Sequence, residues 1–121
     1  MGISVINFEE KFDKIEELHS YKLIAQMNDY HFKLVKMKRD FIWHSHPETD
    51  EVFIIIDGSM QINLRDETLH LNKGEMVVIP KGIEHKPSSR EECKILLIEP
   101  GGTINTGNAG GNLTDTDLEW I

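Results

Sequence analysis

Cysteine is almost absent from this chain of 121 residues, since Cys93 is the only one. One cysteine cannot form an internal disulfide, which favours a reducing compartment such as the cytoplasm. Cys93 opens a stretch in which Ile95 and Leu97 follow at alternate positions. We therefore expect a buried, unreactive thiol at Cys93 and not a nucleophile.

Long hydrophobic runs and an excess of positive charge are also missing. The longest apolar run covers residues 52–56, far too few to span a bilayer, and residues 1–7 lack the basic and apolar regions of a signal peptide. The net charge is −8 and the isoelectric point is about 5.1. A negative protein repels phosphate backbones and anionic lipids, so we expect neither a nucleic acid nor a membrane as a partner.

The length and composition are those of a single globular domain, with 39% hydrophobic and 28% charged residues. Residues 1–20 predict a short N-terminal helix: Asn7 and Glu10 form a capping box, and Phe8, Phe12 and Ile15 recur at helical spacing. Residues 101–121 are rich in glycine and asparagine and predict an irregular C-terminal tail. Leu118, Trp120 and Ile121 can anchor its end.

The sequence between these ends predicts many short strands separated by turns. Strands are expected in the ranges 21–24, 31–37, 41–46, 51–63 (with a turn at 57–59), 64–71 (a hairpin around residues 65–67), 75–79 and 93–99. Residues 81–87 predict a loop and residues 88–92 a polar turn. The pattern favours an all-β fold, an antiparallel sandwich or barrel.

One predicted strand is apolar on both faces. Phe53 and Ile55 share a face with Glu51, whereas Val52 and Ile54 lie on the opposite face. A barrel has one interior, so the second face is expected to lie against another subunit or against the N-terminal helix. This is the basis for predicting a homodimer.

Two histidines and a glutamate follow one another closely in the chain. His44 and His46 are two residues apart, so on a strand their imidazoles point to the same side. Pro47 breaks this strand, and Glu51 opens the next one, which places a carboxylate beside the two imidazoles. These groups at this spacing indicate a divalent metal site.

A further histidine follows Gly82 in a loop bounded by glycine and proline. Gly82 lets the chain fold back, so His85 can point inward. A lone loop histidine is usually solvated, but together with His44, His46 and Glu51 it completes a set of three imidazoles and one carboxylate.

These residues resemble the two motifs of the cupin superfamily. The pattern H-x-H-x4-E-x6-G is matched by His44, His46, Glu51 and Gly58, and G-x5-P-x-G-x2-H by Gly74, Pro80, Gly82 and His85. The resemblance covers roughly residues 32–100. It implies a jelly-roll barrel, also called a double-stranded β-helix, in which His44, His46, Glu51 and His85 bind one divalent metal.

The chain departs from the family pattern at two places. Lys38 stands where a glycine often begins the first motif, and Ser89 stands where an asparagine often ends the second. His44 occupies the position at which phosphomannose isomerases of this family commonly have glutamine, so that activity is not carried over.

Three neutral imidazoles and one carboxylate around a divalent ion give a net charge of about +1 and leave about two of six coordination positions open. Fe, Mn, Ni, Co and Zn all suit this donor set. Because the ligands must be deprotonated, metal affinity should fall below about pH 6.5. An open metal site can polarise a carbonyl, bind an enediolate or bind dioxygen.

Three functions are open at this stage. We rank first a metal-dependent enzyme acting on a small molecule, of the dioxygenase, isomerase, lyase or decarboxylase type. A sugar- or organic-acid-binding module that uses the same pocket is second, and an interaction protein with a vestigial pocket is third. No catalytic residue is assigned. Several polar residues are candidates for the surroundings of the site, although each is more typical of the surface: Tyr30, Lys36, Arg65, Glu75 and Lys86.

Overall fold

A computed structural model describes residues 2–111, 113–115 and 118–121 of the chain. In this part, one short helix precedes eight strands: α1 (Phe8–Phe12), β1 (Lys22–Met27), β2 (Tyr30–Asp40), β3 (Glu51–Asp57), β4 (Ser59–Asn63), β5 (Thr68–Asn72), β6 (Met76–Ile79), β7 (Lys86–Pro100) and β8 (Glu119–Trp120). The prediction of an all-β barrel behind a short N-terminal helix is confirmed. No helix in these ranges is long and apolar enough to cross a membrane.

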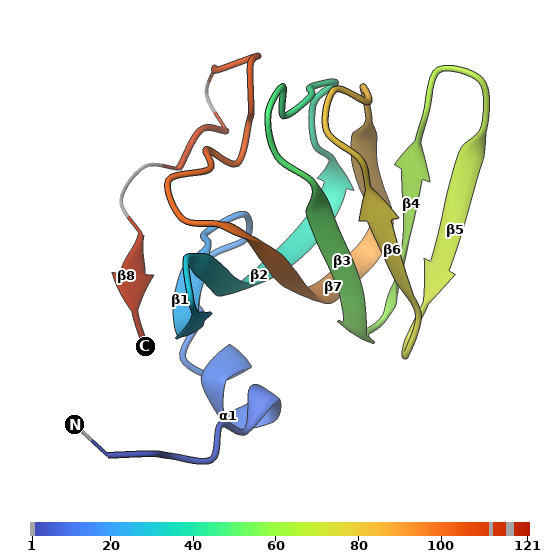
Figure 1. The fold of residues 1–121 in the computed structure, drawn as a ribbon. Helices are drawn as coiled ribbons and strands as arrows, with labels where there is room; N and C mark the ends of the chain where they lie inside the picture. The colour runs from blue at the N-terminus through green and yellow to red at the C-terminus, as the bar shows by residue number, and fades with distance from the viewer. Residues whose placement is uncertain (1, 112, 116–117) are drawn as a thin grey trace.

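The long strand β7 organises the barrel. It pairs with β4 near its start, with β2 along most of its length, and with β3 in its second half, always antiparallel. The hydrogen-bonded order is β5-β4-β7-β2-β1-β8, and β3 connects β7 to β6. Figure 1 shows these strands wrapping around a common interior, with the loops before β3 and β7 at one end and α1 at the other.

Apolar side chains form two clusters on opposite faces of the same strands. The interior cluster contains Val35, Phe53, Ile55, Ile62 and Ile95, all at most 2% exposed. The outer cluster is built around Phe12, Ile15, Leu34 and Leu96, with Ile54 and Ile56 of β3 packed against it. This arrangement explains why β3 is apolar on both faces.

The outer face of β3 is therefore covered in part by the N-terminal region, one of the two alternatives expected for it. The helix begins as predicted, since Oδ1 of Asn7 accepts a hydrogen bond from the backbone N of Glu10 at 2.9 Å. It is shorter than expected, because α1 ends at Phe12. Phe12 and Ile15 are nevertheless both buried, so the predicted apolar stripe makes its contacts across the end of the helix.

Two predictions of local structure were wrong. Residues 41–46 do not form a strand, because only His44 makes a ladder contact there, an isolated bridge to His85. Residues 88–92 are not a turn but belong to β7, where Ser88 and Ser89 pair with Asp40 and Arg39 of β2. Polar side chains favoured a turn at 88–92, but the long partner strand β2 extends the ladder through them.

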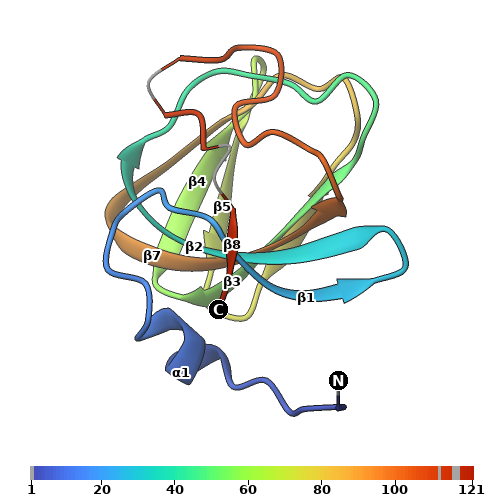
Figure 2. The same cartoon turned by 90° about the vertical axis from the view of Figure 1, so that its left-hand side faces the viewer.

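The C-terminal segment is irregular, as expected, and packs on the barrel. Figure 2 shows it, in orange and red, passing over the end of the barrel opposite to α1. Its last residues form β8, which runs parallel to β1, and the backbone N of Ile121 donates to the Leu23 carbonyl at 3.1 Å. Within the predicted tail, residues 112 and 116–117 lie outside the described residues.

Candidate metal centre

The four residues singled out in the sequence lie together at one end of the barrel. One nitrogen from each of His44, His46 and His85 and one oxygen from Glu51 all lie within 4.8 Å of one another. His44 and His46 are in the segment after β2, Glu51 is the first residue of β3, and His85 directly precedes β7. None of the four residues is more than 4% exposed.

Backbone hydrogen bonds join the two segments that carry the histidines. The N of His44 donates to the carbonyl of His85 at 3.0 Å, and the N of His85 donates to the carbonyl of His44 at 2.9 Å. Next to this bridge, the N of Gly82 donates to the His46 carbonyl at 2.9 Å. The main chain therefore holds the imidazoles near one another independently of any ion.

Hydrogen bonds also set the protonation of two of the rings. Nδ1 of His44 is 2.9 Å from the carbonyl of Ile42, and Nδ1 of His85 is 2.9 Å from the carbonyl of Ile83. A carbonyl oxygen can only accept, so each Nδ1 carries the proton and each neutral ring presents Nε2 as a lone-pair donor. This is the tautomer that ligates a metal through Nε2.

The remaining donors face one another at short distances. Nε2 of His46 lies 3.2 Å from Oε2 of Glu51, and Nε2 of His85 lies 3.3 Å from Oε1 of the same carboxylate. Nε2 of His46 is buried and makes no protein hydrogen bond within the described residues. Buried nitrogens and a carboxylate with so few donors around them fit a divalent cation, so this cluster could bind a metal.

Burial and mutual contacts shift the pKa values of the cluster. Burial lowers the pKa of His44 to about 4, with a further contribution from the neighbouring His85. Burial alone would raise the pKa of Glu51, but its close contacts with His46, His85 and Glu99 outweigh this and hold that pKa below its usual range. At neutral pH His44 is uncharged and Glu51 is ionised, which are the forms a metal requires.

The rings are enclosed by aromatic side chains. Phe41 meets His44 edge to face at a centroid distance of 5.4 Å, and Phe53 meets His85 in the same manner at 6.2 Å. An apolar enclosure limits solvent access and strengthens electrostatic interactions inside it.

The C-terminal segment closes the site beside His46. Asn108 makes two hydrogen bonds to the backbone of Ser45, which lies between His44 and His46. Oδ1 of Asn108 accepts from the Ser45 N at 3.0 Å, and the Asn108 N donates to the Ser45 carbonyl at 3.1 Å. Gly107 has a φ of +54°, and a Cβ there would overlap the Ser45 carbonyl oxygen. A cavity of about 330 Å³ reaches His46 between this segment and residues 47–49.

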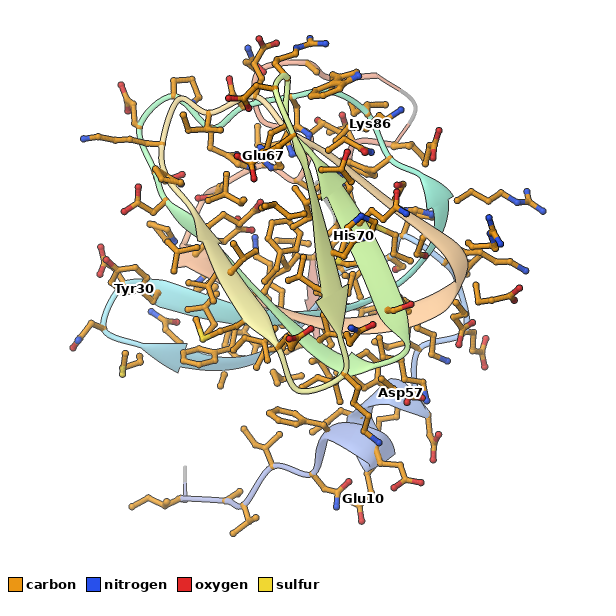
Figure 3. All side chains as sticks on the ribbon, turned by 90° about the vertical axis from the view of Figure 1, so that its right-hand side faces the viewer. Glu10, Tyr30, Asp57, Glu67, His70 and Lys86 are labelled. Atoms are coloured by element: carbon orange, nitrogen blue, oxygen red, sulfur yellow. The ribbon has the colours of Figure 1, made fainter. Side chains whose placement is uncertain are left out.

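The other polar candidates are engaged away from the cluster. Arg65 forms an ion pair with Glu84 and stacks on the ring of Trp43. Nζ of Lys86 lies 3.5 Å from Oδ2 of Asp40. Lys36 donates a hydrogen bond to the Ile15 carbonyl, and the Glu75 carboxylate accepts one from the backbone N of Asn72. Tyr30 lies at the edge of the molecule in Figure 3 and is exposed. Cys93 is buried as expected, and burial raises its pKa to about 12.

Sequence reasoning missed a buried polar group beside Glu51. Lys33 and Glu99 form an ion pair at 2.9 Å with side chains that are 2% and 1% exposed. Tyr21 is buried near the same carboxylates, and burial, followed by the charge of Glu51, raises its pKa. The alternation of side chains along a strand could have identified this pair. Lys33 is two residues from Val35 and Glu99 is two residues from Leu97, so each charged side chain points to the same side as a residue of the interior cluster.

Comparisons with known proteins agree with this geometry. The family described as "Cupin domain" matches residues 31–99. The uncharacterized protein YdbB of Bacillus subtilis is 32% identical over 88 residues, which cover 72% of this chain and 78% of YdbB. A cupin-2 domain containing protein from Shewanella frigidimarina is 56% identical with a TM-score of 0.79 over 79% of this chain and 94% of that one.

A second solved structure extends the likeness over a complete neighbour. Protein NMB1881 from Neisseria meningitidis is 31% identical to this chain with a TM-score of 0.75. The match covers 81% of this chain and all of that one. Together with the family match, the barrel and the paired histidine segments, these similarities confirm the jelly-roll prediction, and the chain belongs to the cupin domain family.

Proposed function

We propose that His44, His46, Glu51 and His85 bind one divalent transition metal ion, Fe, Mn, Ni, Co or Zn, and that the loaded protein is an enzyme acting on a small molecule. The observation that carries this proposal is the convergence of buried donors, two of them Nε2 atoms whose rings are fixed in the ligating tautomer by backbone carbonyls. A fold kept only for its shape does not require that arrangement.

A bound ion would supply Lewis acidity or a site for dioxygen, which suits a dioxygenase, isomerase, lyase or decarboxylase. The chain's own residues contribute the rest. The single carboxylate of Glu51 leaves the loaded site with a net charge of about +1, which favours a substrate offering one anionic or two neutral oxygen atoms. The cavity of about 330 Å³ at His46 limits such a substrate to a small molecule.

Substrate turnover tests this proposal. The protein is loaded separately with Fe²⁺, Mn²⁺, Ni²⁺ and Zn²⁺ and incubated, with and without oxygen, with small hydroxy acids, diketones, catechols and sugars. We expect consumption of one compound class that His46→Ala abolishes, and dependence on oxygen separates a dioxygenase from the other types. A compound that binds but is recovered unchanged would instead favour the binding module.

The binding module is kept as the second candidate because of one observation, the closure of the site. All four donors are at most 4% exposed, and the Asn108–Ser45 contacts fasten the C-terminal segment beside them. A closed site of this kind suits a sensor that holds a sugar or organic acid for a long time.

We also propose a cytoplasmic homodimer. The outer edge of the β3–β6 pair carries Met76 and Val78, which are 56% and 49% exposed, next to the half-buried Val52. These residues continue the outer apolar cluster beyond the part that α1 covers. Light scattering of the purified protein tests the dimer, and Val78→Lys is expected to shift it toward the monomer.

A further inference from the structure

We propose that a cavity on the outer face of the barrel, where β2, β4, β5 and β7 meet, binds a small phosphorylated molecule that carries hydroxyl groups. Its volume is about 550 Å³, and none of the four proposed metal donors lines it. Cavities that hold small molecules commonly enclose roughly 300–1,000 Å³. This second site does not depend on whether the candidate metal centre binds an ion.

Strand alternation gives one side of the cavity its polar side chains. Ser59 and Gln61 of β4 are exposed and alternate with buried residues, and His70 and Asn72 of β5 are exposed on either side of a buried one. The β4–β5 ladder places Ser59 opposite Asn72 and Gln61 opposite His70. Figure 3 views these strands from outside, with His70 on the near side. This side therefore offers a hydroxyl, two amides and an imidazole, which can both donate to and accept from the hydroxyl groups of a ligand.

The other side of the cavity carries positive charge. It includes Arg39, near the end of β2, and Arg90 of β7, both exposed. Neither forms an ion pair within the described part of the chain, whereas the third arginine, Arg65, is paired. Asp40 is the one acidic residue of the lining, and its carboxylate already lies 3.5 Å from Nζ of Lys86. In a chain with a net charge of −8, two arginines without a carboxylate partner favour an anionic ligand.

The backbone at Arg39 is unusual for a strand. The register of the β2–β7 ladder shifts between Met37 and Arg39, and Arg39 has a φ of +70°. A positive φ is uncommon for a residue other than glycine and costs free energy, and such positions cluster at binding sites. Irregularities in a ladder also change the direction in which a side chain points. The strained backbone at Arg39 therefore agrees with a binding role for its side chain.

Two guanidinium groups suit phosphate better than a carboxylate. Each guanidinium presents five N–H donors in a planar fork, which binds two oxygens of a phosphate at once. A carboxylate has only two oxygens and fills one fork, whereas a phosphate monoester has three terminal oxygens, enough for two arginines. The polar side chains across the cavity then select a phosphorylated polyol over inorganic phosphate.

Titration of the full chain with ribose-5-phosphate, ribose and inorganic phosphate tests the proposal. Chelator is present so that phosphate cannot bind through a metal ion, and amide NMR spectra report both affinity and location. We expect ribose-5-phosphate to shift amide signals of β4, β5 and residues 88–90, and to bind at least about tenfold more tightly than either of the other compounds. Absence of binding, equal affinity for ribose or for inorganic phosphate, or shifts confined to the segments that carry His44, His46 and His85 would overturn it.

Arg39→Asn and Arg90→Gln test the two arginines separately. Each removes charge-assisted hydrogen bonds, so the affinity for ribose-5-phosphate should fall at least about tenfold. Asparagine adopts a positive φ more readily than arginine, so Arg39→Asn should keep or raise the melting temperature, and its weaker binding then does not come from unfolding. Arg65→Gln removes an arginine that is already paired and should bind like the parent protein. Unchanged affinity in either cavity variant, or an equal loss in Arg65→Gln, would overturn the proposal.

Discussion

His44 and His85 exchange two backbone hydrogen bonds, of 3.0 and 2.9 Å, although one follows β2 and the other precedes β7. This bridge places their imidazole centroids 4.3 Å apart. The candidate metal centre is thus built by main-chain pairing, and its donors are positioned before any ion arrives. Preorganisation of this kind lowers the conformational cost of binding.

Glu51 is the only carboxylate among the four donors, so replacing it should have a large effect. We expect Glu51→Gln to weaken Zn²⁺ binding by about a hundredfold or more, because the anionic ligand is lost while the side-chain volume is kept. The exposed Glu48 lies in the same connection, and Glu48→Gln should leave the affinity within about twofold. Chelator competition measures both, and equal affinities in the two variants would argue against Glu51 as a ligand.

The stability of the metal-free protein should fall as the pH is lowered from about 6.5 to about 4. The pKa of His44 is lowered to about 4 in the folded state from 6.5 in the unfolded state. Between these values the unfolded chain binds more protons, so the free energy of unfolding rises with pH, by on the order of 3 kcal/mol in total.

Urea denaturation at intervals of pH measures this dependence. Glu99 acts in the opposite direction above the usual pKa of a carboxyl, because burial raises its pKa. The contribution of His44 is therefore taken as the difference between the parent protein and His44→Asn, whose dependence should be flatter over the same range. Identical slopes in the two proteins would contradict the assignment.

Gly107→Ala should loosen the C-terminal segment over the site. Gly107 and Gly110 both have positive φ, +54° and +67°, so alanine costs about 1 kcal/mol of backbone strain at either position. Only at Gly107 would the new Cβ also overlap Ser45, whereas at Gly110 it meets nothing within 4 Å. We expect a lower melting temperature and faster metal release for Gly107→Ala than for Gly110→Ala, and equal release rates would count against a covering role.

Phe12→Ala should destabilise the protein by about 3–5 kcal/mol, because Phe12 is fully buried in the outer cluster. Phe8, one turn earlier on α1, is 37% exposed, and Phe8→Ala should cost less than about 1 kcal/mol. Denaturant unfolding compares the two. Similar small decreases in the free energy of unfolding for the two variants would mean that α1 does not cover the outer face of β3.

The sequence predicted the barrel and the gathering of the four donors well, because both depend on short-range signals. Alternating apolar residues specify strands, and the spacing of His44, His46, Glu51 and His85 follows the two family motifs. At residues 88–92 the polar side chains led to the wrong prediction of a turn, since the partner strand that makes these residues part of β7 is the distant β2. At residues 41–46 the prediction of a strand failed for the opposite reason. The side chains alternate as in a strand, but no neighbouring strand pairs with this segment along its length.

The surroundings of the site were harder to predict because they depend on contacts between distant segments. Asn108 meets Ser45, and Glu99 meets Lys33 and Glu51, only once the strands have assembled. A charged residue in phase with interior apolar positions is the signal that could have identified Lys33 and Glu99. Neither its partner nor its location beside Glu51 follows from that phase alone.

The central claim is that this end of the barrel holds one divalent metal ion. Metal analysis of protein purified without chelator, followed by titration of the metal-free chain with Fe²⁺, Mn²⁺, Ni²⁺, Co²⁺ and Zn²⁺, tests it most directly. We predict one ion per chain for the parent protein and none for the double variant His46→Ala/His85→Ala. A folded parent protein that binds none of these ions, or a double variant that binds them equally well, would contradict the claim.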